Sequence, residues 1–181
     1  MKRLFLFGTM CLAALAISAV ISCTKETESN NGNSSGGYGP NNDNDEYVDL
    51  GLPSGTRWKK QNETNTSDAE YDFYTYNEAV TAFGNRLPSK AQWEELKGLC
   101  QWIWSGSSYN VVGPNGNSIF LPAKGYRDCE GNVDGVDSGG DYWSSTTNGS
   151  DGAWGMLFNP GSIYMNSYTL CFGNSVRLVK N

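Results

Sequence analysis

The strongest hydrophobic pattern lies at the start of the chain. Lys2 and Arg3 precede an almost uninterrupted apolar run over residues 4–21. A cationic start followed by an apolar segment is typical of a secretory signal. A single transmembrane anchor is the alternative, because about 20 apolar residues suffice to span a bilayer. The pattern predicts a protein that is exported from the cytoplasm.

Polar residues dominate the next segment. Residues 29–45 are mostly Ser, Asn, Gly and Asp. This composition offers too little apolar surface to offset the entropy of ordering the chain. We therefore expect a flexible linker over residues 23–46 and a folded domain over residues 47–181, where aromatic residues and turn signals become frequent.

A first helix is predicted to start at Thr75, which forms a capping box with Glu78. Its apolar positions follow the helical spacing and are Tyr76, Ala79, Val80 and Phe83. Gly84 suits the end of this helix, because glycine readily adopts the backbone conformation of a helix stop.

A second helix is predicted to start at Ser89, which forms a capping box with Gln92. Trp93 and Leu96 share one face of this helix, and Gly98 suits its end. Both helices are too short to persist alone, so each must pack on the rest of the domain.

The remainder of the domain predicts strands. Residue patterns indicate them over residues 118–121, 153–158, 162–165, 169–172 and 175–179. Tight turns between these segments favour antiparallel hairpins. Polar stretches over residues 125–140 and 144–152 predict long irregular loops. The expected architecture is α+β, with two short helices packed on an antiparallel meandering sheet.

Composition excludes several classes of function. The 181 residues contain no histidine, which excludes Ser-His-Asp and Cys-His catalytic arrangements and every metal site with histidine ligands. The chain has 13 Lys and Arg against 19 Asp and Glu, a net charge of −6. Such a balance offers no broad cationic surface for phosphates, so nucleic acid is not an expected partner.

The apolar run ends at a cysteine. Val20, Ile21 and Ser22 precede Cys23, and this segment resembles the lipobox of bacterial lipoproteins. The resemblance implies a signal peptide over residues 1–22 and acylation of Cys23, which would hold the protein on a membrane. The charged residues 24–28 resemble the signal that sends some lipoproteins of the Bacteroidetes to the outer surface. We therefore expect an outer-membrane, cell-surface lipoprotein.

Three cysteines remain in the domain, namely Cys100, Cys129 and Cys171. Outside the cytoplasm one disulfide is plausible among them. Three pairings are open, and the spacing does not choose between them.

Five sequence blocks resemble a known family. They are VDLGLPSGTRW (48–58), NRLPSKAQWEEL (85–96), LPAKGYR (121–127), YWSST (142–146) and VRLV (176–179). In this order they resemble the Fibrobacter succinogenes major paralogous domain, and they span nearly all of residues 47–181. Its members are mostly secreted proteins or lipoproteins of Bacteroidetes and related bacteria, and most have no assigned activity. The chain departs from this pattern over residues 59–73, where many relatives carry a longer insertion.

The resemblance implies a C-type-lectin-like fold, a fold shared with formylglycine-generating enzymes. The enzyme branch uses a close pair of cysteines shortly before the last strand. Cys171 stands near that place alone, with Val176 five residues further on. Without a thiol pair there is no couple to bind copper or to pass electrons. We therefore expect a protein that is not an enzyme and that needs no cofactor.

Calcium is a second possibility that the lectin-like resemblance raises. The cation needs about six to eight oxygen ligands. Oxygen atoms within one loop come from Asp128, Glu130, Asn132, Asp134, Asp137 and Asp141, and the candidate metal ligands among them are Asp128, Glu130, Asp134 and Asp137. Their spacing matches no EF-hand, and the Trp-Asn-Asp signature of calcium-binding lectins is absent around Cys171. A solvated acidic loop is the favoured interpretation.

Aromatic residues are the candidate ligand contacts. Trp102, Trp104 and Tyr109 lie close together in the sequence and offer flat rings for a sugar or a protein partner. Core packing is the alternative for these rings, and it is the favoured interpretation for Trp93 and Trp143.

Two functions follow from these expectations. The first is a lipid-anchored, non-enzymatic binding or adhesion module for a glycan or a protein, with the long loops as the binding surface. The alternative is a structural subunit of an envelope or fimbrial complex that has no free ligand of its own.

Overall fold

The computed structural model describes residues 46–181. The predicted signal peptide, the predicted lipidation site Cys23 and the predicted linker up to residue 45 lie outside the described residues. Residues 46–181 form an α+β domain, as expected. No helix of this domain is long and apolar enough to cross a membrane.

The domain contains two α-helices and eleven strands within the described residues. The helices are α1 (Tyr76–Phe83) and α2 (Lys90–Leu99), with the short 3-10 helices η1 (Thr66–Asp68) and η2 (Gly84–Arg86). The strands are β1 (Tyr47–Asp49), β2 (Arg57–Lys59), β3 (Gln101–Trp104), β4 (Ser108–Val112), β5 (Ser118–Pro122), β6 (Tyr126–Arg127), β7 (Val133–Asp134), β8 (Gly140–Thr147), β9 (Gly152–Asn159), β10 (Ser162–Thr169) and β11 (Val179–Lys180).

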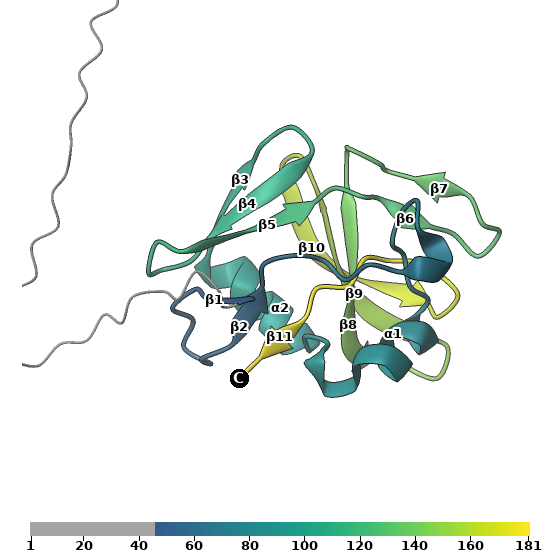
Figure 1. The fold of residues 1–181 in the computed structure, drawn as a ribbon, viewed down its shortest axis with the longest axis horizontal. Coiled ribbons are helices and arrows are strands. Elements are labelled where there is room, and N and C mark those ends of the chain that lie inside the picture. Colours follow the sequence, from purple (N-terminus) through teal and green to yellow (C-terminus); the bar gives the residue numbers. More distant parts are fainter. Residues whose placement is uncertain (1–45) are drawn as a thin grey trace, which may run out of the picture. The chain divides into compact units, whose positions relative to one another are not determined.

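The strands form several small sheets (Figure 1). Three sheets have three strands each, in the orders β1-β2-β11, β3-β4-β5 and β8-β9-β10, and β6 pairs with β7. All these pairs are antiparallel, as expected. Of the predicted hairpins, the one between residues 153–158 and 162–165 is confirmed as β9–β10, whereas the one across residues 173 and 174 does not form. The expectation of one meandering sheet is wrong, because the β3–β5 and β8–β10 meanders are separate sheets.

Helix α1 begins where the sequence predicts. Thr75 and Glu78 form the full capping box, and Gly84 caps the other end with a positive φ of 52°. Tyr76 and Ala79 are buried, whereas Val80 is 40% exposed. The apolar face of α1 is therefore narrower than predicted, and it lies on β8.

Helix α2 is longer than predicted. Ser89 and Gln92 form its capping box, and Trp93 and Leu96 are fully buried against the β8–β10 sheet. Gly98 does not end the helix, which continues to Leu99. The amide of Cys100 donates to the carbonyl oxygen of Leu96 at 3.2 Å, so backbone bonding carries the helix past the glycine.

The predicted strands are confirmed in part. Those at residues 118–121, 153–158 and 162–165 correspond to β5, β9 and the first half of β10. The strand predicted at residues 169–172 is wrong, because β10 ends at Thr169 and a turn follows in which the Phe172 amide donates to the Thr169 carbonyl. Strands β1, β2, β3, β4, β6, β7 and β8 were not predicted. The loops predicted at residues 125–140 and 144–152 are wrong in part, because the first contains β6 and β7 and the second begins within β8.

The strand predicted at residues 175–179 is also wrong except for its last residue. This segment runs through the core, where Arg177 is only 1% exposed. The Arg177 guanidinium donates five hydrogen bonds to four acceptors, which are Asn62 Oδ1 and the carbonyl oxygens of Lys59, Lys60 and Phe120. Arg177 thus joins the segment after β2 to β5 and to the end of the chain.

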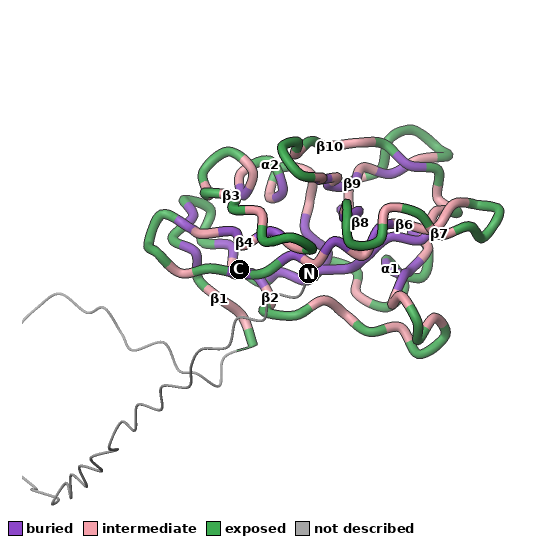
Figure 2. The backbone as a smooth tube through the Cα atoms, turned by 90° about the horizontal axis from the view of Figure 1, so that it is seen from above, coloured by how far each residue is buried: buried purple, intermediate pink, exposed green. Residues whose placement is uncertain are grey.

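The core consists of two clusters of buried side chains. Figure 2 marks the buried positions along the backbone. Trp93 and Trp143 lie in different clusters and are both fully buried, which confirms their predicted core position. The Trp93 indole donates to the carbonyl oxygen of Trp143 at 3.2 Å, and the Trp143 indole donates to that of Tyr74 at 2.7 Å. These bonds tie α2 and the segment before α1 to the centre of β8.

Candidate functional site

A pocket of about 260 Å³ lies where β6, β8, β9 and β10 meet, and we call it the Asp141 pocket. Its lining residues are Tyr126, Asp141, Leu157, Asn166, Ser167, Tyr168, Thr169 and Phe172. One carboxylate, several polar groups and three aromatic rings therefore surround a single cavity. Small-molecule sites commonly combine apolar walls with a few converging polar groups.

Local packing places the aromatic walls. The rings of Tyr126 and Phe172 are stacked, with centroids 5.8 Å apart and planes 22° apart. Tyr168 packs against Phe172 at 5.7 Å. Gly155 makes room for Tyr168, because a Cβ atom there would lie 3.0 Å from the Tyr168 ring and 2.8 Å from the carbonyl oxygen of Tyr142.

Asp141 is the charged group of the pocket. It sits in β8 opposite Leu157 and is only 3% exposed. Its Oδ1 accepts a hydrogen bond from the Tyr168 hydroxyl. Burial raises the pKa of Asp141 to about 6, although the bond from Tyr168 acts in the opposite direction. The carboxyl group is therefore held out of water without a cationic partner, and it is still largely ionised at neutral pH.

The groups around Tyr126 are negatively charged. Burial raises the pKa of its hydroxyl, and the charges of Asp134, Asp141 and Asp128 raise it further. The pocket has no Lys or Arg among its lining residues. The electrostatic potential near Tyr126 therefore favours positive charge.

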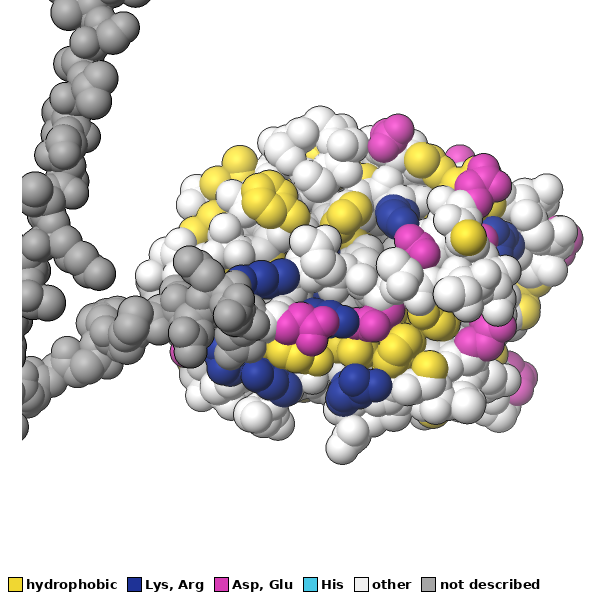
Figure 3. Space-filling view, in the orientation of Figure 1, with side chains coloured by type: hydrophobic (Ala, Val, Ile, Leu, Met, Phe, Trp, Pro, Cys, Tyr) yellow, Lys and Arg dark blue, Asp and Glu magenta, His cyan; other side chains and the backbone are white. Residues whose placement is uncertain are grey.

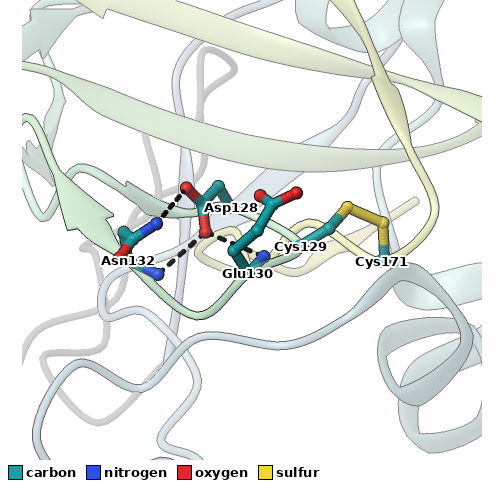
Figure 4. Close-up of a disulfide and its surroundings, with 5 residues drawn as sticks. All are labelled: Asp128, Cys129, Glu130, Asn132 and Cys171. Carbon is teal, nitrogen blue, oxygen red and sulfur yellow. Dashed lines mark hydrogen bonds between the residues drawn. A yellow bond between two sulfur atoms is a disulfide. The ribbon is translucent and has the colours of Figure 1, made fainter.

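A disulfide holds one wall of the pocket (Figure 4). Of the three possible pairings, the structure has Cys129–Cys171. Beside it, the amides of Arg127 and Gly173 each donate to the other residue's carbonyl oxygen, at 2.8 and 2.9 Å. The cross-link and this bridge hold the turn that carries Phe172 against β6.

The third domain cysteine, Cys100, is free and partly buried. Burial, followed by the charge of Glu95, raises the pKa of its thiol to about 11. Cys100 therefore carries a protonated, weakly reactive thiol at neutral pH.

The acidic loop uses its main carboxylate internally (Figure 4). Asp128 accepts from the amides of Glu130 and Asn132 at 3.0 and 2.8 Å, and from the Asn132 side chain at 2.8 Å. Asp134 accepts from the amide of Gly135. Within residues 46–181, no three His, Cys, Asp or Glu side chains gather into a group that could hold a metal ion. The structure therefore does not assemble Asp128, Glu130, Asp134 and Asp137 into a calcium site.

The candidate aromatic surface lies mostly in the core. Tyr109 is 4% exposed, and its hydroxyl donates to the carbonyl oxygen of Asn159 and accepts from the amide of Gly161. Trp102 and Trp104 are half-buried and pack edge-on to Tyr109, at 5.4 and 5.0 Å. Tyr109 therefore offers no free ring face to a ligand. Its ring packs with those of Trp102 and Trp104 on the inner side of the β3–β5 sheet.

Two other pockets differ from the Asp141 pocket in their charges. Arg127 faces a pocket of about 150 Å³ and pairs with Asp68 at 2.8 Å. Lys124 faces a pocket of about 300 Å³ and pairs with Asp72 at 2.7 Å. In both cases the basic side chain already has an acidic partner, and Glu70 and Asp137 also line the Lys124 pocket.

Sequence reasoning did not select the residues of the Asp141 pocket. The sequence indicates Asp141 only as one more oxygen of the acidic loop, and it assigns no ligand contact to Tyr126 or Phe172. One feature of the sequence does point to Asp141. An acidic residue directly before the aromatic Tyr142 and Trp143, in a strand-forming segment, indicates a carboxylate close to the core.

Comparison with known proteins adds one match. Residues 100–179 match a family described as a domain of unknown function, DUF8237. The match covers less than half of the 181 residues but includes every residue of the Asp141 pocket. No curated protein and no solved structure matched the chain.

Proposed function

We propose that this protein is a non-enzymatic binding module, held on the bacterial cell surface by a lipid on Cys23, and that it binds a glycan or a protein partner through the Asp141 pocket. The single observation that carries the proposal is the pocket itself, with an unneutralised buried carboxylate beside stacked aromatic rings. Aromatic faces and a few directed polar groups are the usual means of binding sugars and exposed side chains.

The position of the pocket suits display on a tether. The chain enters the domain at β1, and β6, which carries Tyr126, lies at the opposite end of the domain in both views (Figures 1 and 2). A ligand that approaches β6 is therefore remote from the point where the linker joins. This arrangement supports a role in binding partners outside the cell.

A C-type-lectin-like fold is part of the proposal. The sequence blocks that resemble the major paralogous domain family support it, as do two short helices beside small antiparallel sheets with long connecting loops. A non-enzymatic role is supported by the chain's lack of histidine and by Cys171, which is bonded to Cys129, 42 residues away in the sequence.

Membrane attachment rests on the lipobox-like segment that ends at Cys23. Mass spectrometry of the native protein tests this part directly. We expect a mature chain that begins at an acylated Cys23. An unprocessed Met1 or an unmodified thiol at this position would contradict the anchor.

Binding is tested with the full chain purified in detergent. Glycan arrays and pull-downs, with calcium and with a chelator, are expected to yield a partner that Tyr126→Ala no longer retains. Ile103→Ser is the matched control, because Ile103 is 44% exposed on a different sheet. The absence of any partner under both conditions would contradict a binding function.

A second candidate function, a structural subunit, is favoured by a different surface. Ile103 and Phe120 are 44% and 55% exposed, and both flank Asn110 on the outer face of the β3–β5 sheet. Figure 3 shows hydrophobic side chains gathered over this sheet. A protein that always co-purifies within a defined complex, and loses it in Ile103→Ser, would favour this function over recognition of an external ligand.

A further inference from the structure

We propose that the Asp141 pocket recognises the ammonium group of an amino sugar that is not N-acetylated. This inference rests on the proposed binding function and narrows its ligand class. It assigns Asp141 as the counter-charge of the ammonium group, and Tyr126, Tyr168 and Phe172 as the walls around it.

The charge balance of the domain singles out Asp141. The buried Arg177 uses its guanidinium donors on four neutral acceptors of the domain. Two partly buried carboxylates have basic partners, Asp68 with Arg127 and Asp72 with Lys124. Asp141 is more deeply buried than these, and its hydrogen-bond partner is the neutral hydroxyl of Tyr168. A buried charge without a counter-ion is costly, and a cation that enters the pocket removes this cost.

The aromatic walls favour the same type of ligand. A cation near the face of an aromatic ring is attracted by the ring's quadrupole. Tyr126, Tyr168 and Phe172 line the same pocket as the Asp141 carboxylate, so a cation bound there lies near their rings. The charges of Asp128 and Asp134 also reach Tyr126. An ammonium group thus meets favourable electrostatics from the rings and from the surrounding carboxylates.

The remaining lining residues favour a sugar as the carrier of the ammonium group. The Asn166 amide and the Thr169 hydroxyl supply donors and acceptors for ring hydroxyls. The aromatic walls that Tyr126 and Phe172 contribute supply apolar contact for the ring carbons of a pyranose. A neutral or N-acetylated sugar can make these contacts but leaves the Asp141 charge unpaired. The free amine is therefore the feature that the pocket selects.

Calorimetry on the full chain in detergent tests this inference with glucosamine, N-acetylglucosamine and glucose at pH 7. We expect glucosamine to bind roughly tenfold more tightly than either neutral sugar. Asp141→Asn keeps the shape of the side chain and removes its charge, and it should abolish this preference. Glu130→Gln removes an exposed acid of the neighbouring loop and should leave the preference unchanged.

A pH series on the unmodified protein provides a test that does not depend on a variant. Lowering the pH from 7 to 5 should weaken glucosamine binding by roughly tenfold, because Asp141 takes up a proton. The titratable groups that face Asp141 are Tyr126 on β6, Tyr142 on β8 and Tyr168 on β10, and their raised pKa values keep them neutral throughout this range. Binding of glucose should not change.

The outcomes separate this inference from the proposed function. Equal binding of glucosamine and N-acetylglucosamine, or an unchanged preference in a folded Asp141→Asn variant, overturns the ammonium inference and leaves the binding function intact. Binding of a lysine-rich protein in place of any sugar, lost in Asp141→Asn, overturns the choice of an amino sugar. Failure to bind any glycan or protein on the arrays described above overturns both.

Discussion

Asp141→Asn should stabilise the domain at neutral pH, because the native carboxylate is costly to bury. The folded domain raises the pKa of Asp141 from 3.8 to about 6. A rise of this size corresponds to about 3 kcal/mol of lost stability at pH 7, since each pKa unit is worth about 1.4 kcal/mol. Asparagine has nearly the same shape, and its carbonyl oxygen can accept the hydrogen bond from Tyr168.

The sign of this effect follows from proton binding. Between about pH 4 and pH 6 the folded state holds a proton on Asp141 that the unfolded chain has released. The contribution of Asp141 to the free energy of unfolding therefore falls as the pH rises through this window. Below about pH 4 both states are protonated, and the difference between the native and variant proteins should vanish.

Urea unfolding, followed by tryptophan fluorescence from pH 4 to pH 7, measures the difference directly. Trp143 packs against Tyr168 with ring centroids 5.8 Å apart, so the probe lies beside the substituted site. Subtracting the variant from the native protein at each pH cancels the other titrating groups. Glu130→Gln is the control and should change stability by less than about 0.5 kcal/mol.

Equal stability of Asp141→Asn and the native protein at pH 7 would refute the reasoning. So would a stabilisation that is as large at pH 4 as at pH 7, because only the ionised carboxylate carries the cost. If Asp141→Asn stabilises the fold and also abolishes the ligand preference, Asp141 lowers stability in exchange for binding. Such an exchange of stability for activity is typical of functional sites.

Three further predictions concern stability and are measured by urea unfolding. Arg177→Met leaves four acceptors without their donor and should cost about 3–5 kcal/mol. An unchanged unfolding midpoint would contradict the structural role of Arg177. Gly155→Ala places a Cβ atom 2.8 Å from a carbonyl oxygen, so it should lower the free energy of unfolding by about 1–3 kcal/mol. Unchanged stability would contradict the close packing at Gly155, because it would mean that β9 can move to accept the added methyl group. Replacing Cys129 and Cys171 with serine opens a loop of 42 residues and should cost up to about 4 kcal/mol, whereas Cys100→Ser should not change the effect of a reducing agent.

The helices could be predicted because their signals are local. Each capping box lies within four residues, and Thr75 and Ser89 both cap as expected. The end of α2 could not be predicted from a local signal of this kind. Burial of Trp93 and Leu96 against the β8–β10 sheet favours continued helix, and this tertiary packing outweighs the modest helix penalty of Gly98.

The strands were harder to predict than the helices, because the burial of a strand depends on partners that are distant in the sequence. In β3, Trp102 and Trp104 alternate with exposed residues, but a segment of four residues gives too short a pattern to separate a strand from a surface cluster. The segment around Arg177 has the apolar content of a strand. Its backbone instead bonds to residues 59 and 63, over a sequence separation that no local pattern reveals.

The site could not be predicted for the same reason. Tyr126, Asp141 and Phe172 lie on three separate segments, and the Cys129–Cys171 bond that brings two of these together was one of three possible pairings. The residues that the sequence did suggest, such as Tyr109, were chosen for their aromatic character alone. Aromatic character does not distinguish a ring in the core from a ring at a ligand site.

The sheet formed by β1, β2 and β11 has a mechanical consequence. Three residue pairs join β1 to β2, and the chain from the linker enters at β1. Tension on a tethered protein is therefore applied first to this short strand. The turn after β10 is cross-linked at Cys171 to the loop after β6. With the anchor proposed at Cys23, a force between anchor and ligand loads β1 at one end and the Asp141 pocket at the other. The three residue pairs of β1 and β2 should therefore open before the cross-linked wall of the pocket.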